Sequence, residues 1–91
     1  MLEAAKNAIR QENGVYMMVH HLGHENPKLL TILTDCLRIL AIKNAATKEL
    51  ILQGNGPTLL VNIMKHQTYK NLIFMTSRLL KGKLVSYHPF I

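Results

Sequence analysis

The segment ATKELILQGNGPTLLVNIMKHQTYKNLIFMTSRLLK, residues 46–81, repeats an earlier part of the same chain. A shift of 42 residues aligns it without a gap with AAKNAIRQENGVYMMVHHLGHENPKLLTILTDCLRI, residues 4–39, and 12 of the 36 paired positions are identical. The identities include Lys6/Lys48, Gly14/Gly56, Val19/Val61, Lys28/Lys70, Leu30/Leu72, Thr34/Thr76 and Leu37/Leu79. Self-similarity at a fixed period of this length is the signature of a stacked-repeat architecture.

Each period is expected to hold three helices. In the first period they span residues 4–11, 15–22 and 27–42, and in the second residues 47–53 and 57–65 are followed by a long third helix. Pro27 and Pro57 suit a first helical turn, with Asn26 and Gly56 before them as caps. Three helices in about 42 residues favour the armadillo class over the shorter ankyrin and tetratricopeptide repeats. We therefore expect an all-α, right-handed armadillo-repeat solenoid of about two repeats.

Leucines spaced by three and four residues mark the buried face of each third helix. They are Leu30, Leu33, Leu37 and Leu40 in the first repeat, and Leu72, Met75 and Leu79 in the second. The chain divides on this pattern into repeats at residues 1–43 and 44–81 and a divergent tail at 82–91. Because Gly82 and Pro89 disfavour a helix, this tail is expected to fray from Gly82 onward and to leave the second leucine face poorly covered. We expect the 91 residues alone to be marginally stable and prone to self-association.

The composition favours acidic partners of any kind, whether nucleic acid, anionic lipid or an acidic peptide, and charge alone does not choose among them. Eleven Lys and Arg against five Asp and Glu give a net charge of +6. The single cysteine, Cys36, excludes an internal disulfide and is typical of a reducing compartment. His20 and His24 share a helical face but lack acidic or cysteine ligands nearby, so no metal site is expected. The sequence contains no catalytic or nucleotide-binding motif, which predicts a protein without enzymatic activity or cofactor; no run of residues is apolar enough for membrane insertion.

Four segments resemble the armadillo domain of the β-catenin and plakoglobin family: TDCLRILA (34–41), ATKELIL (46–52), GPTLLVNIM (56–64) and TSRLLK (76–81). The resemblance runs without a gap over about residues 4–81 and implies a fragment that covers two central repeats of a divergent member. Four positions depart from the family pattern. Ile42-Lys43 stands where the family has Tyr-Gly, Asn71 replaces a lysine, and Phe74 replaces a tryptophan of the binding groove.

Helical periodicity nominates candidate groove residues on the side of each third helix opposite the leucines. They are Leu29, Ile32 and Cys36 in the first repeat and Asn71, Phe74 and Arg78 in the second. The resemblance adds further positions: it implies that Lys48 pairs with acids of a partner, that Phe74, Arg78 and Lys81 are groove residues, and that Lys28 and Leu29 lie near the axin-binding part of the groove. Cys36 itself is expected to be a small packed residue.

The family resemblance implies a protein-binding scaffold in cell–cell adhesion and Wnt-type signalling and transcription co-activation. Its expected partners are extended acidic tails of the cadherin, T-cell-factor, axin and adenomatous polyposis coli types, and its expected locations are the cytoplasm, cell junctions and nucleus. One alternative is a nuclear-import adaptor of the importin-α type, although a positively charged groove repels basic peptides. Another is a basic helical nucleic-acid binder, for which no recognition-helix pattern is present; no direct contact with nucleic acid is therefore expected.

Overall fold

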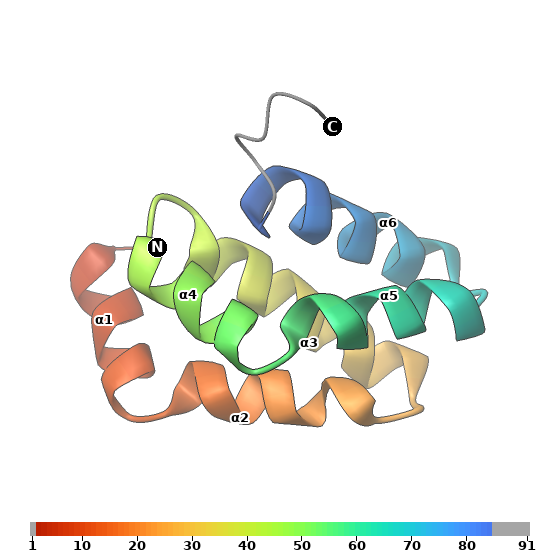
Figure 1. Cartoon of the computed structure of the whole chain (residues 1–91), viewed down its shortest axis with the longest axis horizontal. Helices are drawn as coiled ribbons and strands as arrows, with labels where there is room; N and C mark the ends of the chain where they lie inside the picture. Colours follow the sequence, from red (N-terminus) through yellow and green to blue (C-terminus); the bar gives the residue numbers. More distant parts are fainter. Residues whose placement is uncertain (1, 85–91) are drawn as a thin grey trace.

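A computed structural model describes the backbone of residues 2–84 and the side chains of residues 2–81, and this part of the chain is helical throughout with short connections (Figure 1). The first repeat consists of α1 (Glu3–Gln11), α2 (Gly14–His20), the short 3-10 helix η1 (His21–Gly23) and α3 (Pro27–Ala41). The second consists of α4 (Ala45–Gln53), α5 (Gly56–His66), α6 (Lys70–Arg78) and the π-helical extension η2 (Leu79–Leu84). The all-α prediction and the three helices per repeat are confirmed. The handedness of the solenoid and the repeat boundaries stay predictions.

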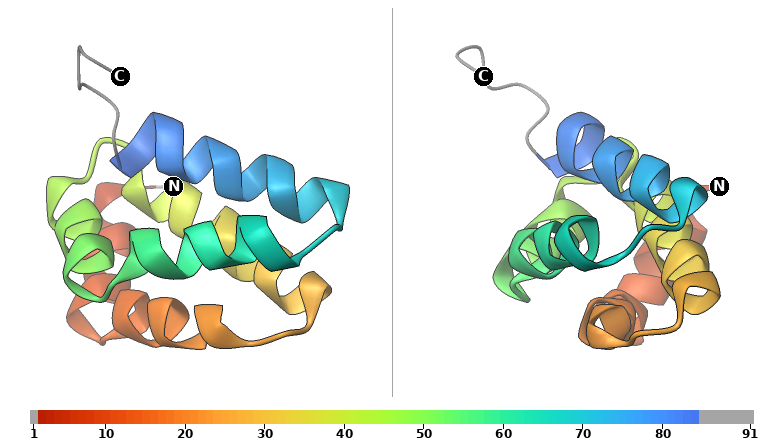
Figure 2. Two further views of the ribbon diagram at one scale, coloured as in Figure 1. Left: turned by 45° about the vertical axis from the view of Figure 1, so that its right-hand side comes forward. Right: turned by 90° about the vertical axis from the view of Figure 1, so that its right-hand side faces the viewer.

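The helices form two layers. The third helices, α3 and α6, pack side by side in one layer, and α2 and α5 lie in the other (Figure 2). Within residues 2–81, twelve apolar side chains form the buried core: Val15, Val19, Leu22, Leu30, Leu37, Leu40, Ala41, Ile51, Leu60, Ile63, Leu72 and Leu79. One core therefore spans both repeats, as expected when each repeat buries its apolar face against its neighbour.

The leucine stripes point into this core. Leu30, Leu37 and Leu40 are buried as predicted, whereas Leu33 and Met75 are only half-buried. Leu72 and Leu79 are both 0% exposed. The expectation that these two leucines are poorly covered was therefore wrong, because α3 packs against both α6 and η2.

The predicted end of the last helix was also wrong. The helical backbone continues through Gly82 to Leu84 as the π-helical segment η2. Packing of η2 against α3 stabilises this continuation and outweighs the weak helix preference of Gly82. The rest of the predicted tail, residues 85–91, lies outside the described residues.

The break between the first and second helix of each repeat depends on an Asn-Gly pair. Asn13 and Asn55 adopt left-handed backbone conformations with φ of 64° and 62°, which Asn tolerates better than most residues. Gly14 and Gly56 then begin α2 and α5. A methyl group on Gly14 would lie 2.8 Å from the Ile9 carbonyl oxygen, and one on Gly56 would lie 2.5 Å from the Ile51 carbonyl oxygen. Gly56 is thus the first helical residue rather than the predicted cap, and glycine is needed for close packing.

The residues at the two ends of α3 differ in how well they fit the local backbone conformation. Asn26 caps the helix as predicted: its Oδ1 accepts hydrogen bonds from the backbone N–H groups of Lys28 (2.9 Å) and Leu29 (3.3 Å). Beyond the other end, Lys43 adopts a φ of 49°, which favours glycine. Lysine in this conformation costs about 1 kcal/mol.

Among residues 2–84, no helix combines the length and apolar character needed to cross a bilayer.

Candidate peptide-binding face

The sequence-predicted residues of the first repeat lie along one side of α3. Lys28 is exposed, Ile32 is 61% exposed, and Leu29 and Cys36 are half-buried. Leu30, Thr34 and Leu37, on the opposite side of the same helix, are buried. The side of α3 that carries Ile32 therefore faces away from the core.

The corresponding residues of the second repeat lie on α6 and η2. Asn71, Arg78 and Lys81 are exposed, and Phe74 is 55% exposed. The Arg78 guanidinium carbon lies 5.5 Å from the centre of the Phe74 ring. A cation–π contact at an exposed site stabilises by about 0.5–1 kcal/mol. It holds the arginine beside the aromatic ring and places a positive charge next to an apolar surface.

Lys70, which was not among the predicted site residues, also belongs to this face. It is exposed, and with Phe74, Met64 and Ile73 it lines a shallow pocket of about 390 Å³. It occupies the same position in the second repeat as Lys28 in the first. The repeat identity Lys28/Lys70 was the signal that could have identified it.

The charge of this face is strongly positive in the second repeat. No acidic residue follows Glu49 in the sequence, and this face carries the exposed Lys70, Arg78 and Lys81. In the first repeat the single acid of α3, Asp35, pairs with Arg38 at 2.8 Å. Uncompensated positive charge therefore gathers around Phe74 rather than around Ile32.

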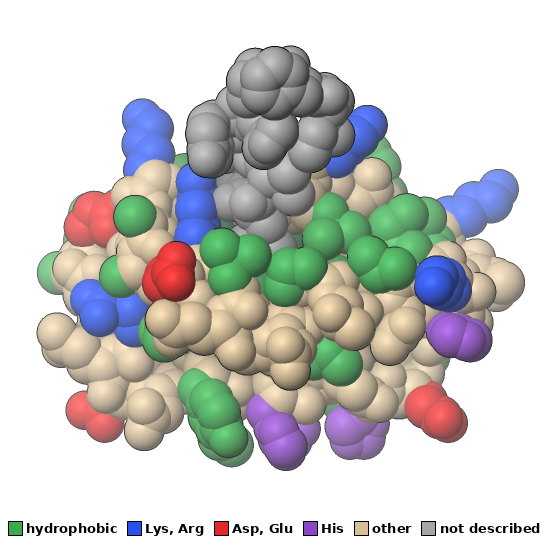
Figure 3. All heavy atoms as spheres, viewed as in Figure 1, with side chains coloured by type: hydrophobic (Ala, Val, Ile, Leu, Met, Phe, Trp, Pro, Cys, Tyr) green, Lys and Arg blue, Asp and Glu red, His purple; other side chains and the backbone are tan. Residues whose placement is uncertain are grey.

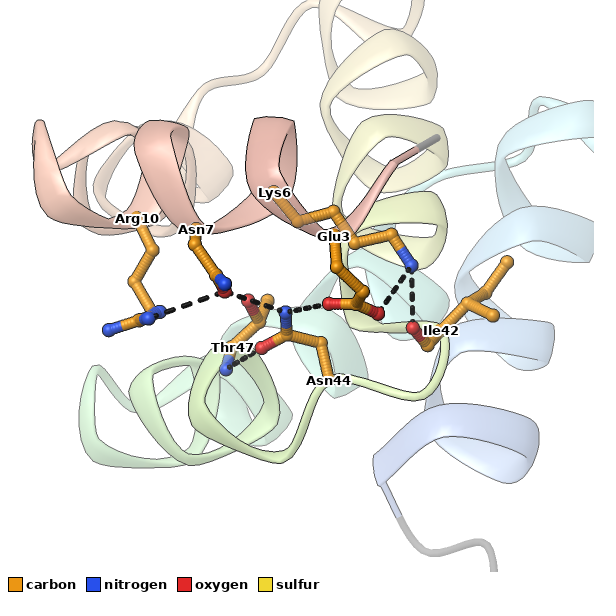
Figure 4. Close-up of polar contacts among 7 residues, drawn as sticks. All are labelled: Glu3, Lys6, Asn7, Arg10, Ile42, Asn44 and Thr47. Atoms are coloured by element: carbon orange, nitrogen blue, oxygen red, sulfur yellow. Dashed lines mark hydrogen bonds and ion pairs between the residues drawn. The ribbon is translucent and has the colours of Figure 1, made fainter.

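Lys48 lies apart from the other predicted residues, on α4, and is half-buried. Its equivalent in the first repeat, Lys6, is 4% exposed, and its Nζ donates a hydrogen bond of 2.6 Å to the carbonyl oxygen of Ile42 just beyond α3 (Figure 4). Nζ also lies 3.7 Å from a carboxylate oxygen of Glu3. A lysine at this position of the repeat can thus connect the first helix to the end of the third.

Asn44 extends this network across the junction between the repeats (Figure 4). Its Nδ2 donates hydrogen bonds to Glu3 (3.0 Å) and Asn7 (3.3 Å), and its Oδ1 accepts one from the backbone N–H of Thr47 (3.0 Å). One buried amide therefore caps α4 and ties it to α1. This junction was not foreseen from the sequence, although the Lys6/Lys48 identity pointed to a shared role.

His20, His21 and His24 form a row on the surface. His20 stacks on Tyr16 at 6.2 Å between ring centres and meets His21 edge to face at 5.5 Å. Within residues 2–84, His, Cys, Asp and Glu side chains do not gather in groups of three that could hold a metal ion.

Comparison with known proteins supports the family suggested by the repeats. Human junction plakoglobin is 47% identical over 79 residues, which cover 87% of this chain and 11% of plakoglobin. Catenin beta of Urechis caupo is also 47% identical over 79 residues, with 87% and 10% covered. Over this span the chain belongs to the β-catenin and plakoglobin family.

A more distant member shows the same relationship: the β-catenin/armadillo-related protein 1 of Caenorhabditis briggsae is 32% identical over 73 residues, which cover 79% of this chain and 9% of that protein. No family model matches the chain. The chain spans about a tenth of the length of these relatives. The match therefore identifies β-catenin-type armadillo repeats, while the activities of a whole family member are a matter for proposal.

Proposed function

We propose that the chain binds extended acidic protein segments along the exposed face of α3 and α6. The observation that carries this proposal is the paired exposure of Ile32 (61%) and Phe74 (55%) at the same position of two adjacent third helices. Large apolar side chains of this kind act as anchoring points in protein recognition. Lys28, Lys70, Arg78 and Lys81 surround them with positive charge, which favours an acidic partner and increases its rate of association.

The proposed binding residues are Lys28, Leu29, Ile32, Lys48, Asn71, Phe74, Arg78 and Lys81. Ile32 and Phe74 supply apolar contacts, and the basic residues pair with acids of the partner. Asn71 offers a neutral amide in place of a charge, so it contributes a hydrogen bond to the backbone of an extended peptide. Lys48, half-buried on α4, is included because the family resemblance assigns it a role in pairing with the acids of a partner.

In the setting of the family, this activity belongs to a scaffold for cell–cell adhesion and Wnt-type signalling, with a role in transcription co-activation. The acidic tails expected are those of cadherins, T-cell factors, axin and adenomatous polyposis coli, and the expected locations are cell junctions, the cytoplasm and the nucleus. An importin-α-type role is disfavoured because Lys70, Arg78 and Lys81 repel a basic localisation signal.

Fluorescence anisotropy with a labelled extended peptide rich in Asp and Glu, containing two apolar residues, tests this function. We expect saturable binding that Phe74→Ala weakens about tenfold, because the ring supplies the apolar contact. Tyr16→Ala is the matched control: Tyr16 is 62% exposed, lies on α2 in the other layer, and its loss leaves binding unchanged.

Two outcomes contradict the proposal. One is equal weakening by the two substitutions. The other is binding to a DNA duplex as tight as binding to the peptide and unaffected by Phe74→Ala, which would indicate that net charge alone attracts polyanions.

A further inference from the structure

A half-enclosed cavity of about 210 Å³ lies where the two repeats meet, between η1 and α5. Its floor is apolar: Leu22, Leu30 and Ile63 are buried, and Leu59 is half-buried. Gly23 leaves one side open, because a Cβ at this position would meet no atom within 4 Å. An apolar cavity of about 150 Å³ is large enough to bind benzene. This cavity therefore has room for the ring system of an aromatic side chain.

The polar lining of the cavity is rich in hydrogen-bond acceptors. It comes from His24, Glu25, Asn62, His66 and Gln67. An ionised Glu25 carboxylate can only accept. His66 Nδ1 lies 2.9 Å from the Asn62 carbonyl oxygen, so the neutral ring carries its proton on Nδ1 and keeps Nε2 as an acceptor. Gln67 donates from its Nε2 to the Glu25 carbonyl oxygen at 3.0 Å, which engages the donor group of that amide. A ligand in the cavity therefore needs a donor at its polar end.

The cavity adjoins a wider surface hollow of about 700 Å³, because Gly23, His24 and Glu25 line both. His20 and His21 complete the lining of the hollow. The His21 ring lies 5.5 Å from that of His20 and 6.1 Å from that of His24, centre to centre. Figure 3 shows histidine side chains along the lower edge of the molecule, where α2 runs. The hollow has room for the residues on either side of one that enters the cavity, as a protein segment requires.

We propose that this cavity receives a tryptophan side chain presented by a protein partner, at a site separate from the exposed face of α3 and α6. The indole ring offers a large apolar surface, and its Nε1–H can donate but not accept. It is uncharged, so the net charge of +6 does not oppose its binding. Phenylalanine lacks the donor, and a lysine or arginine would bring a charge that this basic chain repels.

The fluorescence of N-acetyl-tryptophanamide measures this binding directly, because the chain contains no tryptophan of its own. The full chain is titrated into a fixed, low concentration of this probe. We expect a saturable shift of its emission to shorter wavelength, with a dissociation constant on the order of 0.1 mM, as is typical of a ligand of this size. The derivative methylated on the indole nitrogen lacks the donor and should bind about fivefold more weakly. N-acetyl-phenylalaninamide should compete only weakly for the same reason.

Leu59→Phe tests the location of the site, because the larger side chain fills part of the cavity and should abolish the saturable shift. Leu52→Phe is the matched control: Leu52 is 43% exposed on α4 and does not line the cavity, so binding should be unchanged. Gly23→Leu is a second block, at a position where an added side chain meets no neighbouring atom at its Cβ. Circular dichroism verifies that each variant is folded.

Three results overturn the proposal. One is a probe whose emission does not change at any concentration of the folded chain. Another is binding that persists in both folded blocking variants, which would mean that the indole binds elsewhere. The third is equally tight binding of the methylated or the phenylalanine derivative, because the acceptors around the cavity would then play no part in recognition.

Discussion

Replacement of Lys6 by methionine tests the junction between the two repeats. Methionine keeps most of the length and the flexibility of the side chain but removes the donor to the Ile42 carbonyl, which accepts at 2.6 Å in the unmodified chain. Hydrogen bonds to charged groups contribute about 1.5–3 kcal/mol. Because an apolar side chain avoids the cost of burying a charge, we expect a loss near the lower end, about 1.5 kcal/mol.

Urea unfolding followed by far-ultraviolet circular dichroism measures this loss. With a slope of about 1–3 kcal/mol/M for a small domain, the midpoint should fall by about 0.5–1.5 M at unchanged slope. Lys65→Met is the control, because Lys65 is exposed on α5 and surface substitutions change stability by about 0.5 kcal/mol or less. Equal midpoints for the two variants would refute the account of Lys6 as a buried connection between helices.

Three further pairs of substitutions test the core, the binding face and the break between α4 and α5. Leu72→Ala should lower the free energy of unfolding by about 2–5 kcal/mol because Leu72 is 0% exposed. Phe74→Ala should leave most of the stability intact and weaken peptide binding. A larger loss of stability for Phe74→Ala than for Leu72→Ala would mean that α6 turns Phe74 rather than Leu72 toward the core. Lys48→Glu should weaken binding of an acidic peptide more than Lys65→Glu does. A contact with a desolvated charge is worth about 1.5–3 kcal/mol, whereas a contact with an exposed charge is worth about 1 kcal/mol or less. Equal losses of affinity in anisotropy titrations would indicate that only the net charge of the chain matters. Gly56→Ala should lower the thermal midpoint, because the added methyl group meets the Ile51 backbone, whereas Gly23→Ala meets no atom within 4 Å and should leave the midpoint unchanged or raise it.

The repeat pattern predicted the fold because stacking requires the same residue types at the same positions in each unit. The helices, the Asn26 cap and the buried Leu30, Leu37 and Leu40 all follow from local spacing and capping chemistry. The exposure of Ile32 and Phe74 agrees with the face that periodicity nominated, while their binding role stays a prediction.

Contacts between repeats were harder to predict, because they depend on how closely two backbones approach. Thr34 and Thr76 are polar yet 0% exposed. The buried Thr34 hydroxyl donates a hydrogen bond of 2.7 Å to the Leu30 carbonyl oxygen. In the sequence Lys6 cannot be told from a surface lysine, because its hydrogen bond to the Ile42 carbonyl depends on where α3 ends relative to α1. The continuation of η2 through Gly82 likewise reflects packing against α3, which outweighs the weak helix preference of glycine.

The binding face itself is tested most directly by amide chemical-shift perturbation in NMR spectra of the chain during titration with the acidic peptide. We expect the largest shifts along α3 and α6, centred on Ile32, Phe74 and Arg78, with α1 and α2 unaffected. Shifts that cluster on α2 and α5 while α6 stays unchanged would contradict the assignment of this face as the site of protein binding.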